Sequence, residues 1–387
     1  MKILHIIPDL APDSGGPVSA VFGMAKAQSL MGHSVTVVAT HYGRPELPSL
    51  KQVDFHLYSC DFPRWRWSSQ LKESLYFHVH DANIVHIHTL WSFPVLAGVD
   101  ACVQLNKPYI LRPCGMLDPW SLSQKRWFKK LYLFCFQRII SKAAAVHFTS
   151  EQERMNSAPY VKGIRSFVSP LGVSFDDYEN LPDAEAFRKR FPELGEDLLV
   201  LFLSRLHYKK QPEVVIRAFW KIATTTPHIR LVMAGPGNKN YVRQLKYLVN
   251  QLGLNNKVLF TGMLSGLAKQ EVLSAASIFV LPSLHENFGI SVVEATAAGL
   301  PVIISDRINL ADDISLAQAG LVCPPTLEEL TQAMHQLIQD PVLCERMGRN
   351  GKKLARDKFD WPFVAECLID EYDRILKIST CFTPTLN

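Results

Sequence analysis

Residues 276–306 constrain the fold of this chain more than any other stretch. An apolar run that ends at Ser283 is followed by a loop closed by Gly289 and a helical segment stopped by Gly299. A second apolar run, 302–304, comes next. This order of strand, loop, helix and strand predicts a parallel βαβ unit. Ligands of such units bind at the carboxyl ends of the strands, where the helix N-terminus attracts an anion.

The loop and helix of this unit carry candidate binding groups. Glu286, Asn287, Gly289 and Ile290 lie where a phosphate-bearing ligand is expected, and Glu294 follows one turn into the helix. Carboxylates accept well from paired hydroxyls, such as those of a sugar or a ribose. The arrangement therefore suits a nucleotide-sugar. The alternative is that Glu294 lies on the solvated face of the helix and that Glu286 only interacts with the helix dipole.

The N-terminus predicts a second unit of the same kind. A strand over 2–8 leads into a glycine-containing turn, a helix over 18–31 and a strand over 33–39. Gly15 and Gly16 allow the backbone to approach a ligand closely. They are equally compatible with a tight turn that serves no ligand.

Strands and helices alternate through the rest of the chain. Further strands are predicted within 83–91, 108–117, 198–204, 230–237 and 257–264, and a helix within 359–376. Most of these strands run into a glycine-containing loop. A length of 387 residues favours two domains, and the alternation predicts that both are doubly wound α/β domains.

Two cations and two histidines stand at expected strand ends. Arg205 and Lys210 follow the strand at 198–204, where two positive charges can hold a diphosphate, although two isolated cations in a loop are more often surface charges. His86 and His88 share one face of their strand, but no third metal ligand follows at a fixed spacing. His88, at the strand end, is expected to line a cleft.

The charge of the chain is uneven. Residues 1–170 contain 18 Lys+Arg and 11 Asp+Glu, and the remainder contains 23 and 25, so the first part carries about +7 and the rest about −2. This favours an acidic partner for the first part, either nucleic acid or an anionic membrane surface.

One basic and aromatic segment favours the membrane. No acidic residue lies between Asp118 and Glu151, and residues 120–142 combine lysines and arginines with tryptophan, tyrosine and phenylalanine. Such a segment can lie on lipid headgroups, or it can be an ordinary amphipathic helix. The basic positions are Lys125, Arg126, Lys129, Lys130, Arg138 and Lys142.

The expected compartment is the cytoplasm. No apolar run approaches 18 residues and no leader pattern follows Met1. The eight cysteines include no CxxC pair, which suits a reducing compartment and argues against a zinc ribbon.

Together these motifs resemble the family 4 glycosyltransferases, which are retaining enzymes of the GT-B fold. The resemblance rests on Gly15–Gly16, the SerArgLeu run ending at Lys210, AlaGlyProGly at 234–237 and the Glu-x7-Glu spacing from Glu286 to Glu294. It implies two facing Rossmann-like domains with the active site in the cleft. The domains are expected at 1–178 and 179–361, with a last helix at 362–387 crossing back onto the first.

The resemblance also implies roles for individual residues. Arg205, Lys210 and Glu286 would be catalytic, while the acceptor side would include Gly15, His88 and Cys114. Cys114 stands where many relatives have a histidine, and Gln211 stands where many have a glycine. The donor would be held by Gly16, Met263, Leu264, Asn287, Phe288, Gly289, Ile290 and Glu294.

The expected reaction moves a sugar from a nucleotide-sugar to a glycan or polyprenyl-linked acceptor, with retention of anomeric configuration. No Asp-x-Asp pair is present, so no metal and no separate cofactor are expected, and nucleic acid is not an expected partner. A peripheral position on the inner face of the membrane, with a role in polysaccharide synthesis, is consistent with the basic segment. The alternatives are an epimerase or phosphorylase of the same fold, and a non-catalytic sugar-phosphate-binding protein. A nicotinamide-dependent oxidoreductase is disfavoured because no GxGxxG follows the first strand.

Overall fold

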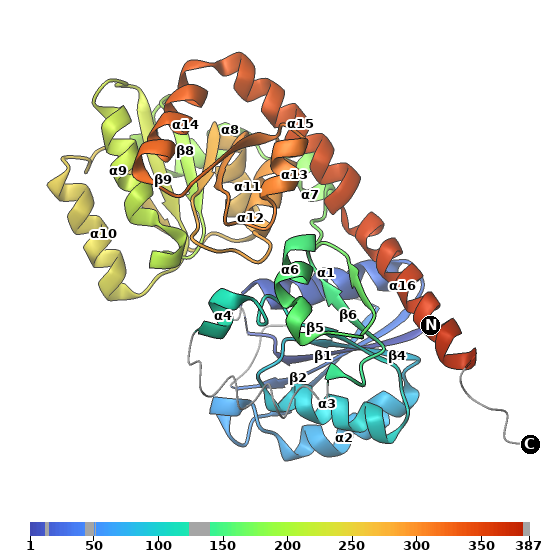
Figure 1. The fold of residues 1–387 in the computed structure, drawn as a ribbon. Helices are drawn as coiled ribbons and strands as arrows, with labels where there is room; N and C mark the ends of the chain where they lie inside the picture. Colours follow the sequence, from blue (N-terminus) through green and yellow to red (C-terminus); the bar gives the residue numbers. More distant parts are fainter. Residues whose placement is uncertain (12–14, 43–49, 51, 124–139, 382–387) are drawn as a thin grey trace, which may run out of the picture. The chain divides into compact units, whose positions relative to one another are not determined.

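The chain folds into two α/β units, shown in Figure 1. The computed structural model describes residues 1–11, 15–42, 50, 52–123 and 140–381. Unit 1 comprises Met1–Gly172 and Trp361–Asn387, and unit 2 comprises Val173–Asp360. The prediction of two doubly wound α/β domains is confirmed.

Unit 1 is built on one sheet of seven parallel strands, in the order β3-β2-β1-β4-β5-β6-β7. The central strands β1, β4 and β5 are almost entirely buried, as expected for a parallel sheet covered on both faces. The strands are β1 (Lys2–Asp9), β2 (Ser34–His41), β3 (Val53–Ser59), β4 (Ile84–His88), β5 (Tyr109–Arg112), β6 (Ala145–Phe148) and β7 (Ser166–Val168).

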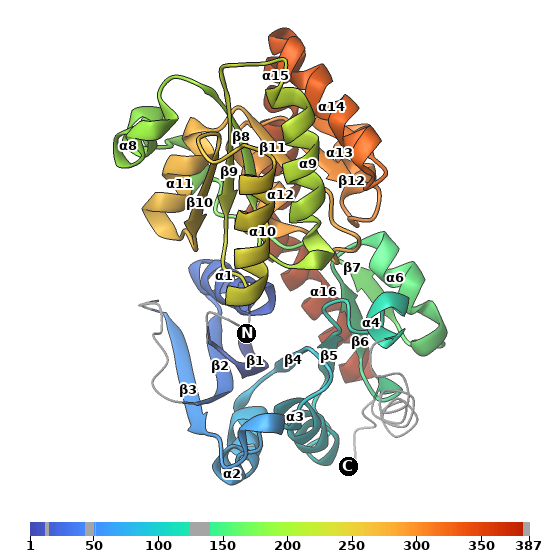
Figure 2. The same cartoon turned by 90° about the vertical axis from the view of Figure 1, so that its left-hand side faces the viewer.

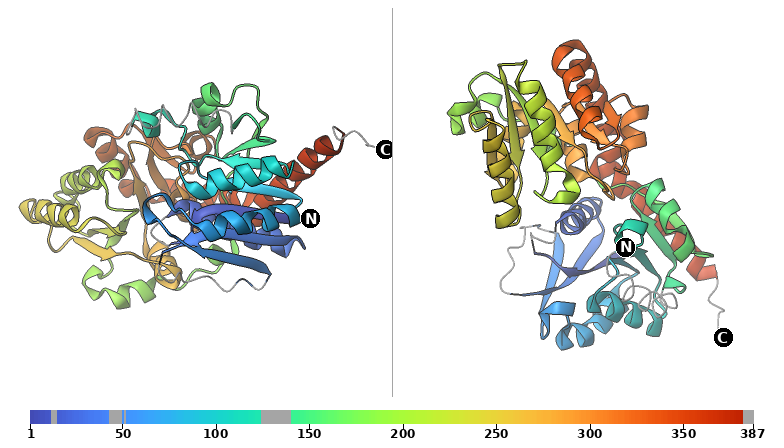
Figure 3. Two further views of the ribbon diagram at one scale, coloured as in Figure 1. Left: turned by 90° about the horizontal axis from the view of Figure 1, so that it is seen from below. Right: turned by 60° about the vertical axis from the view of Figure 1, so that its left-hand side comes forward.

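Helices cover both faces of this sheet. Helices α2 and α3 pack on one face, which is seen from the near side in the view from below in Figure 3. Helix α1 packs against the opposite face and contacts the long last helix, α16. The helices of unit 1 are α1 (Gly16–Leu30), α2 (Ser69–Asp81), α3 (Phe93–Gln104), α4 (Pro119–Ser123), α6 (Glu151–Ser157) and α16 (Trp361–Cys381), with short 3-10 turns at Pro63–Trp65 and Ala158–Tyr160.

Unit 2 contains six parallel strands in the order β10-β9-β8-β11-β12-β13. Helices α9 and α10 lie side by side over β8 and β9 in Figure 2. The strands are β8 (Leu198–Leu203), β9 (Ile229–Ala234), β10 (Val258–Gly262), β11 (Ile278–Leu281), β12 (Val302–Ser305) and β13 (Gly320–Cys323). The helices are α7 (Asp176–Glu179), α8 (Ala184–Arg190), α9 (Pro212–Ala223), α10 (Lys239–Gln251), α11 (Gly266–Ala275), α12 (Ile290–Ala297), α13 (Ala311–Leu316), α14 (Leu327–Gln339) and α15 (Pro341–Phe359), with 3-10 turns at Pro192–Leu194 and Tyr208–Lys210.

The βαβ unit predicted at 276–306 is formed by β11, α12 and β12. Gly289 caps the start of α12 with a φ of 87°, and Gly299 follows its end with a φ of 81°. Helix α15 lies so close to the end of α12 that a Cβ on Gly348 would stand 2.1 Å from the carbonyl oxygen of Gly299. Glycine at this position therefore allows the backbone contact that holds α12 in place.

Replacement of Gly348 by alanine is expected to destabilise unit 2. The new methyl group meets a backbone oxygen that cannot rotate away, so α15 and α12 must separate, at a cost of about 1–3 kcal/mol. Denaturant unfolding measures the loss. Gly16→Ala is the control, because a Cβ there meets none of the described atoms within 4 Å. Equal stabilities of the two variants would contradict the expected clash.

The chain passes between the units at two places, Gly172–Val173 and Asp360–Trp361. Within unit 2, the Val173 N–H donates to the Phe359 carbonyl over 2.7 Å. Within unit 1, the Trp361 indole packs on Gly172, where a Cβ would lie 2.5 Å from the ring. The boundaries expected from the sequence lie at 178/179 and 361/362.

Candidate functional site

The carboxyl ends of β8 and β11 bring two predicted residues of unit 2 into contact. The Lys210 ammonium forms an ion pair with the Glu286 carboxylate, and the Leu284 N–H donates to the Lys209 carbonyl over 2.8 Å. The two loops are adjacent because β8 and β11 are neighbours in the sheet. Arg205 is exposed just beyond the end of β8. A cluster of cations and a carboxylate therefore stands at one edge of the sheet.

The pKa of Lys210 is subject to opposing influences. Burial, together with the charges of Lys209 and Arg205, lowers the pKa of Lys210 to about 7. The Glu286 carboxylate in contact with it favours the charged form and acts in the opposite direction. The effect of Arg205 on this pKa shows that the two predicted cations share one electrostatic environment.

Gln211 explains why relatives commonly have glycine at this place. Its φ of 57° and ψ of 41° lie in the left-handed region, and its N–H donates to the Tyr208 carbonyl over 3.0 Å. Pro212 then begins α9. The turn that presents Lys210 thus requires a left-handed residue, which glycine adopts without strain and glutamine adopts at a cost.

The start of α12 forms the other half of this edge. The Gly289 carbonyl accepts from the Val292 N–H over 2.8 Å, and a Cβ on Gly289 would meet Glu286 Cγ at 3.4 Å. Phe288 is buried against Phe359, while Asn287 and Ile290 are partly exposed. Within the described part of the chain, no side chain caps the first N–H groups of this helix. They provide the free donors that an anion needs.

Glu294 belongs to this edge but has other partners. Its Oε1 lies 2.6 Å from Nζ of Lys269 on α11, and the buried Tyr178 phenol of α7 is hydrogen-bonded to it. Burial and the negative charge of Glu294 raise the pKa of Tyr178. Lys269 and Tyr178 were not expected from the sequence, since neither stands in a recognisable motif and both depend on how α7 and α11 pack against α12.

The β10–α11 loop carries the remaining donor-side candidates. Met263 is largely exposed and Leu264 partly so. Gly262, just before them, lines a cavity of about 490 Å³ at the carboxyl ends of β8, β9 and β10. A larger hollow of about 670 Å³ lies by Lys257 and Arg230, near the beginnings of β9 and β10. Of these two, the smaller is on the side of the sheet where ligands of α/β proteins bind.

Unit 1 presents two candidate loops at its own carboxyl edge. Gly15 caps α1 with a φ of 73°, and a Cβ added at Gly15 or Gly16 would meet none of the described atoms within 4 Å. Cys114 follows β5 with a φ of 55°, and burial raises the pKa of its thiol. The buried Glu153 carboxylate holds the next residue, accepting from the Gly115 N–H over 2.6 Å.

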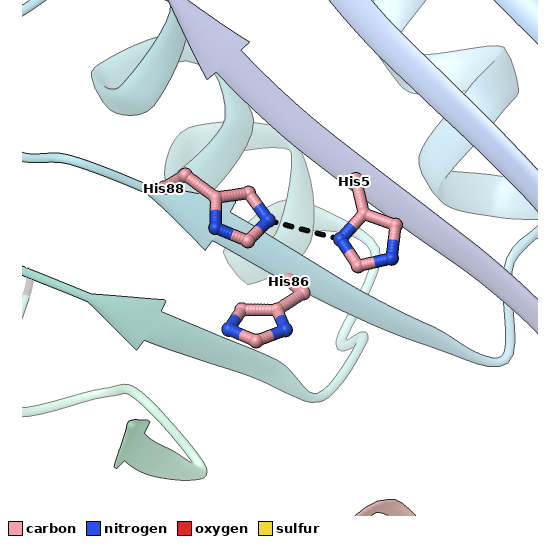
Figure 4. A group of neighbouring side chains, drawn as sticks. All are labelled: His5, His86 and His88. Carbon is pink, nitrogen blue, oxygen red and sulfur yellow. Dashed lines mark hydrogen bonds between the residues drawn. The ribbon is translucent and has the colours of Figure 1, made fainter. Parts of the chain in front are cut away.

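His88 belongs to a buried chain of hydrogen bonds on the sheet face that α1 and α16 cover. Figure 4 shows His5 on β1 beside His86 and His88 on β4. All three are completely buried, as is His147 on β6. The chain runs from Arg112 through His88 (3.1 Å), His5 (2.9 Å), Gln28 (2.8 Å), Tyr372 (3.3 Å), His86 (2.6 Å) and His147 (3.2 Å) to the Ser169 carbonyl (2.8 Å).

The two ends of this chain fix every proton in it. Arg112 can only donate and the Ser169 carbonyl can only accept, so each group between them accepts from one neighbour and donates to the next. All four imidazoles are therefore neutral and carry their proton on Nε2. Burial lowers the pKa of His5 to about 4 and that of His147 to about 3, and it lowers those of His86 and His88 well below their usual value, with the Arg112 charge acting in the same sense.

This network bears on two expectations. The structure supplies the third histidine that the spacing lacked, since ring nitrogens of His5, His86 and His88 lie within 4.8 Å of one another. These nitrogens are already engaged in hydrogen bonds, and the Arg112 guanidinium beside His88 repels a cation, so the group does not fit a metal ion. His88 was expected to line a cleft. Its complete burial and two bonded nitrogens show instead that it faces the interior.

The basic segment at 120–142 lies largely outside the described residues, including Lys125, Arg126, Lys129, Lys130 and Arg138. Among the helices that the structure does describe, none has the length and apolar character needed to cross a bilayer.

Comparisons with known proteins agree with this architecture. The family model described as "Glycosyl transferases group 1" matches residues 183–354, and the one described as "Glycosyl transferase 4-like domain" matches residues 15–159. An uncharacterized glycosyltransferase of Methanocaldococcus jannaschii is 25% identical over 96% of this chain and 98% of its own length. Mannosylfructose-phosphate synthase of Agrobacterium fabrum is 31% identical, over 53% of this chain and 47% of that protein.

Solved structures show the same fold over the whole chain. HepE of Anabaena, solved in complex with UDP and glucose, has a TM-score of 0.79 at 18% identity and covers 97% of this chain and 100% of its own. Sucrose-phosphate synthase from Thermosynechococcus elongatus has a TM-score of 0.79 at 21% identity, covering 98% and 100%. The two parallel α/β units thus have the GT-B fold of glycosyltransferases. The two family models between them span both units, and the chain belongs to the family 4-type GT-B glycosyltransferases.

Proposed function

We propose that this glycosyltransferase moves a sugar from a nucleotide-sugar to a glycan or lipid-linked acceptor, with retention of anomeric configuration and without a metal ion. The observation that carries the proposal is the meeting of Lys210 and Glu286 beside the start of α12, with Arg205 close by. Cations and free helix N–H groups at one edge suit a diphosphate. A carboxylate among them suits the hydroxyls of the transferred sugar.

The remaining donor contacts follow from the positions of the side chains in unit 2. Glu294 is assigned to the ribose hydroxyls, and Met263 and Leu264 are assigned to the base because they flank the cavity at the end of β10. Asn287, Phe288, Gly289 and Ile290 supply the loop and helix start at the phosphate. Gly16, in the open turn of unit 1, is assigned to the donor phosphate or the acceptor.

The proposed chemistry relies on charge stabilisation of the leaving group. As the bond between the sugar and the diphosphate breaks, negative charge grows on the phosphate oxygen, and Arg205, Lys210 and the start of α12 stabilise it. The acceptor hydroxyl attacks from the face that the diphosphate leaves, and the departing phosphate oxygen takes its proton. A chelator should leave the rate unchanged, whereas a metal requirement would contradict the assignment of these cations.

The acceptor is assigned to unit 1. Its carboxyl edge carries the turns at Gly15–Gly16 and Cys114, and a nearby turn at 62–67 exposes Phe62, Trp65 and Trp67. This turn is tied to the edge by an ion pair of 3.0 Å between Arg66 and Asp9 at the end of β1. Exposed aromatic rings suit a sugar face or a lipid headgroup region, which supports a glycan or polyprenyl-linked acceptor at the cytoplasmic membrane face.

A panel of nucleotides and nucleotide-sugars tests the donor assignment by thermal shift. A ligand present at 100 times its dissociation constant stabilises the protein by roughly 2.7 kcal/mol, which raises the melting temperature measurably. Uridine and guanosine diphosphates and their sugar derivatives should include at least one such ligand. If none raises the melting temperature, the donor site is assigned wrongly.

Product analysis separates the transferase from its two alternatives. The donor that stabilises the protein is incubated with a pool of glycan and lipid-linked acceptors. Release of nucleoside diphosphate that requires an acceptor supports transfer. Conversion of one nucleotide-sugar into another without an acceptor would identify an epimerase. Tight binding with no turnover would identify a binding protein.

A further inference from the structure

Glu294 is held by two side chains to which the proposed function assigns no role. Lys269 approaches Oε1 at 2.6 Å, and Tyr178 is hydrogen-bonded to the same carboxylate. These partners come from different elements, α11 and α7, which enclose α12 at this point. The Glu294 side chain is 13% exposed and that of Lys269 is 27% exposed. The carboxylate is therefore reachable from solvent while its orientation is fixed from two sides.

The Glu294 carboxylate has hydrogen-bonding capacity beyond these two partners. An ionised carboxylate can accept about four hydrogen bonds, and among the described residues Lys269 and Tyr178 use two of them. The remaining two match a pair of neighbouring hydroxyls, which donate side by side. The Lys269 charge also keeps Glu294 ionised, so that it can act only as an acceptor.

The position of Lys269 connects this carboxylate with the loop that precedes α11. That helix begins at Gly266, directly after the loop containing Met263 and Leu264, and Lys269 lies one turn further on. Gln270, its neighbour, donates to the Asp177 carbonyl of α7 over 2.8 Å, which ties the two supporting elements together. A shift of α11 would therefore move the Glu294 carboxylate and the loop at the same time.

We propose that Lys269 and Tyr178 are positioning residues that orient Glu294 to select a ribose over a deoxyribose in the donor. The inference rests on the proposed function, because it takes Glu294 as the ribose ligand. Lys269 and Tyr178 need not touch the nucleotide. They hold the Glu294 carboxylate at the angle at which both of its oxygens meet the 2′ and 3′ hydroxyls.

The alternative is an ion pair that only supports the packing of α11. A pair of this exposure contributes little to stability, and its loss would then affect all nucleotides alike. The two possibilities differ in one measurable quantity, the ratio of the dissociation constants of a 2′-deoxynucleotide and the matching ribonucleotide. Orientation of Glu294 changes this ratio, whereas packing of α11 does not.

The experiment compares UDP with 2′-deoxy-UDP, and GDP with 2′-deoxy-GDP, by calorimetric titration. The wild type should bind the better ribonucleotide roughly ten to a hundred times more tightly than its deoxy form, as expected for one hydrogen bond to a charged group. In Lys269→Met this ratio should fall to about three or less, and the affinity for the deoxy form should stay within about twofold. Tyr178→Phe should lower the ratio in the same direction.

Arg349→Met is the matched control. It also removes one cation of a 2.6 Å ion pair in unit 2, but its partner Glu345 is on the same exposed helix, α15. The ratio should remain at the wild-type value in this variant. An unchanged ratio in Lys269→Met, or equal weakening of both nucleotides, overturns the inference and leaves the proposed function standing. Absence of nucleotide binding by the wild type overturns both.

Discussion

Replacement of Lys210 by alanine is expected to lower turnover by about two to three orders of magnitude. Lys210 is the buried cation of the phosphate edge, and loss of one preorganised group that stabilises developing charge has an effect of this size. The KM for the nucleotide-sugar should change less than kcat if the ammonium acts mainly on the leaving diphosphate. Steady-state kinetics with the donor identified by thermal shift measures both.

A matched variant separates this effect from a general loss of positive charge. Lys221→Ala removes an exposed lysine from the last turn of α9, away from the loops at the strand ends. Its kcat should equal that of the wild type. An undiminished kcat in Lys210→Ala, with the melting temperature preserved, would show that Lys210 does not stabilise the leaving group.

The pH dependence of the wild type follows from the same residue. Burial and the neighbouring Lys209 and Arg205 lower the pKa of Lys210 to about 7, so the free enzyme loses the cation as the pH rises through that value. The kcat/KM should therefore decline above about pH 7. A bound diphosphate favours the charged ammonium, so the corresponding decline in kcat should occur at higher pH.

Unit 1 is expected to lose stability steeply as the pH falls below about 6.5. The hydrogen-bond chain holds His5, His86, His88 and His147 neutral, and burial lowers the pKa of each. Unfolding releases them to their ordinary pKa of about 6.5, so below that pH the unfolded state binds more protons and gains in free energy. Above pH 7 both states are neutral and the effect vanishes.

The expected slope is large because four groups act together. Each contributes about 1.4 kcal/mol per pH unit while it stays neutral in the folded state, so the four contribute roughly 5 kcal/mol per unit. This is comparable with the whole stability of a typical domain. Unit 1 should therefore unfold at a pH not far below 6, before unit 2. Six of the seven tryptophans are in unit 1, so intrinsic fluorescence reports its unfolding, and Trp220 alone reports unit 2.

Two measurements check the origin of this lability. Nitrogen NMR of labelled histidines should show four neutral rings protonated on Nε2 at neutral pH. Tyr372→Phe should lower the stability of unit 1 by removing the central hydroxyl, whereas Tyr58→Phe removes a Tyr–His hydrogen bond of 2.8 Å that is only partly buried and should matter less. A denaturation midpoint that is constant from pH 7 to pH 5.5 would exclude the neutral chain.

Sequence patterns predicted the elements of this protein well because local signals specify them. The runs at 278–281 and 302–305 are strands, and Gly289 and Gly299 bound the helix between them. The cations at 205 and 210 were placed correctly at the end of β8 because the carboxyl ends of parallel strands share one edge. The ion pair of Lys210 with Glu286 follows from the adjacency of β8 and β11, which no local pattern encodes.

Long-range contacts account for what the sequence did not reveal. Gln28 meets Tyr372 across 344 positions, and His5 meets His88 across 83, so spacing could not indicate the buried network. His88 consequently looked like a residue of the edge rather than of the interior. Lys269 and Tyr178 escaped notice for the same reason, because only the packing of three helices brings them to Glu294.

The insertion of unit 2 between two parts of unit 1 has a consequence for biosynthesis. Tyr372 lies on the last helix, so the ribosome must make all of residues 173–360 before the sheet of the first unit can receive this helix. Unit 2 is contiguous in sequence and can complete its core while the earlier strands still wait for part of their covering. A chain truncated before Trp361 should therefore yield a folded second unit joined to an incompletely folded first one.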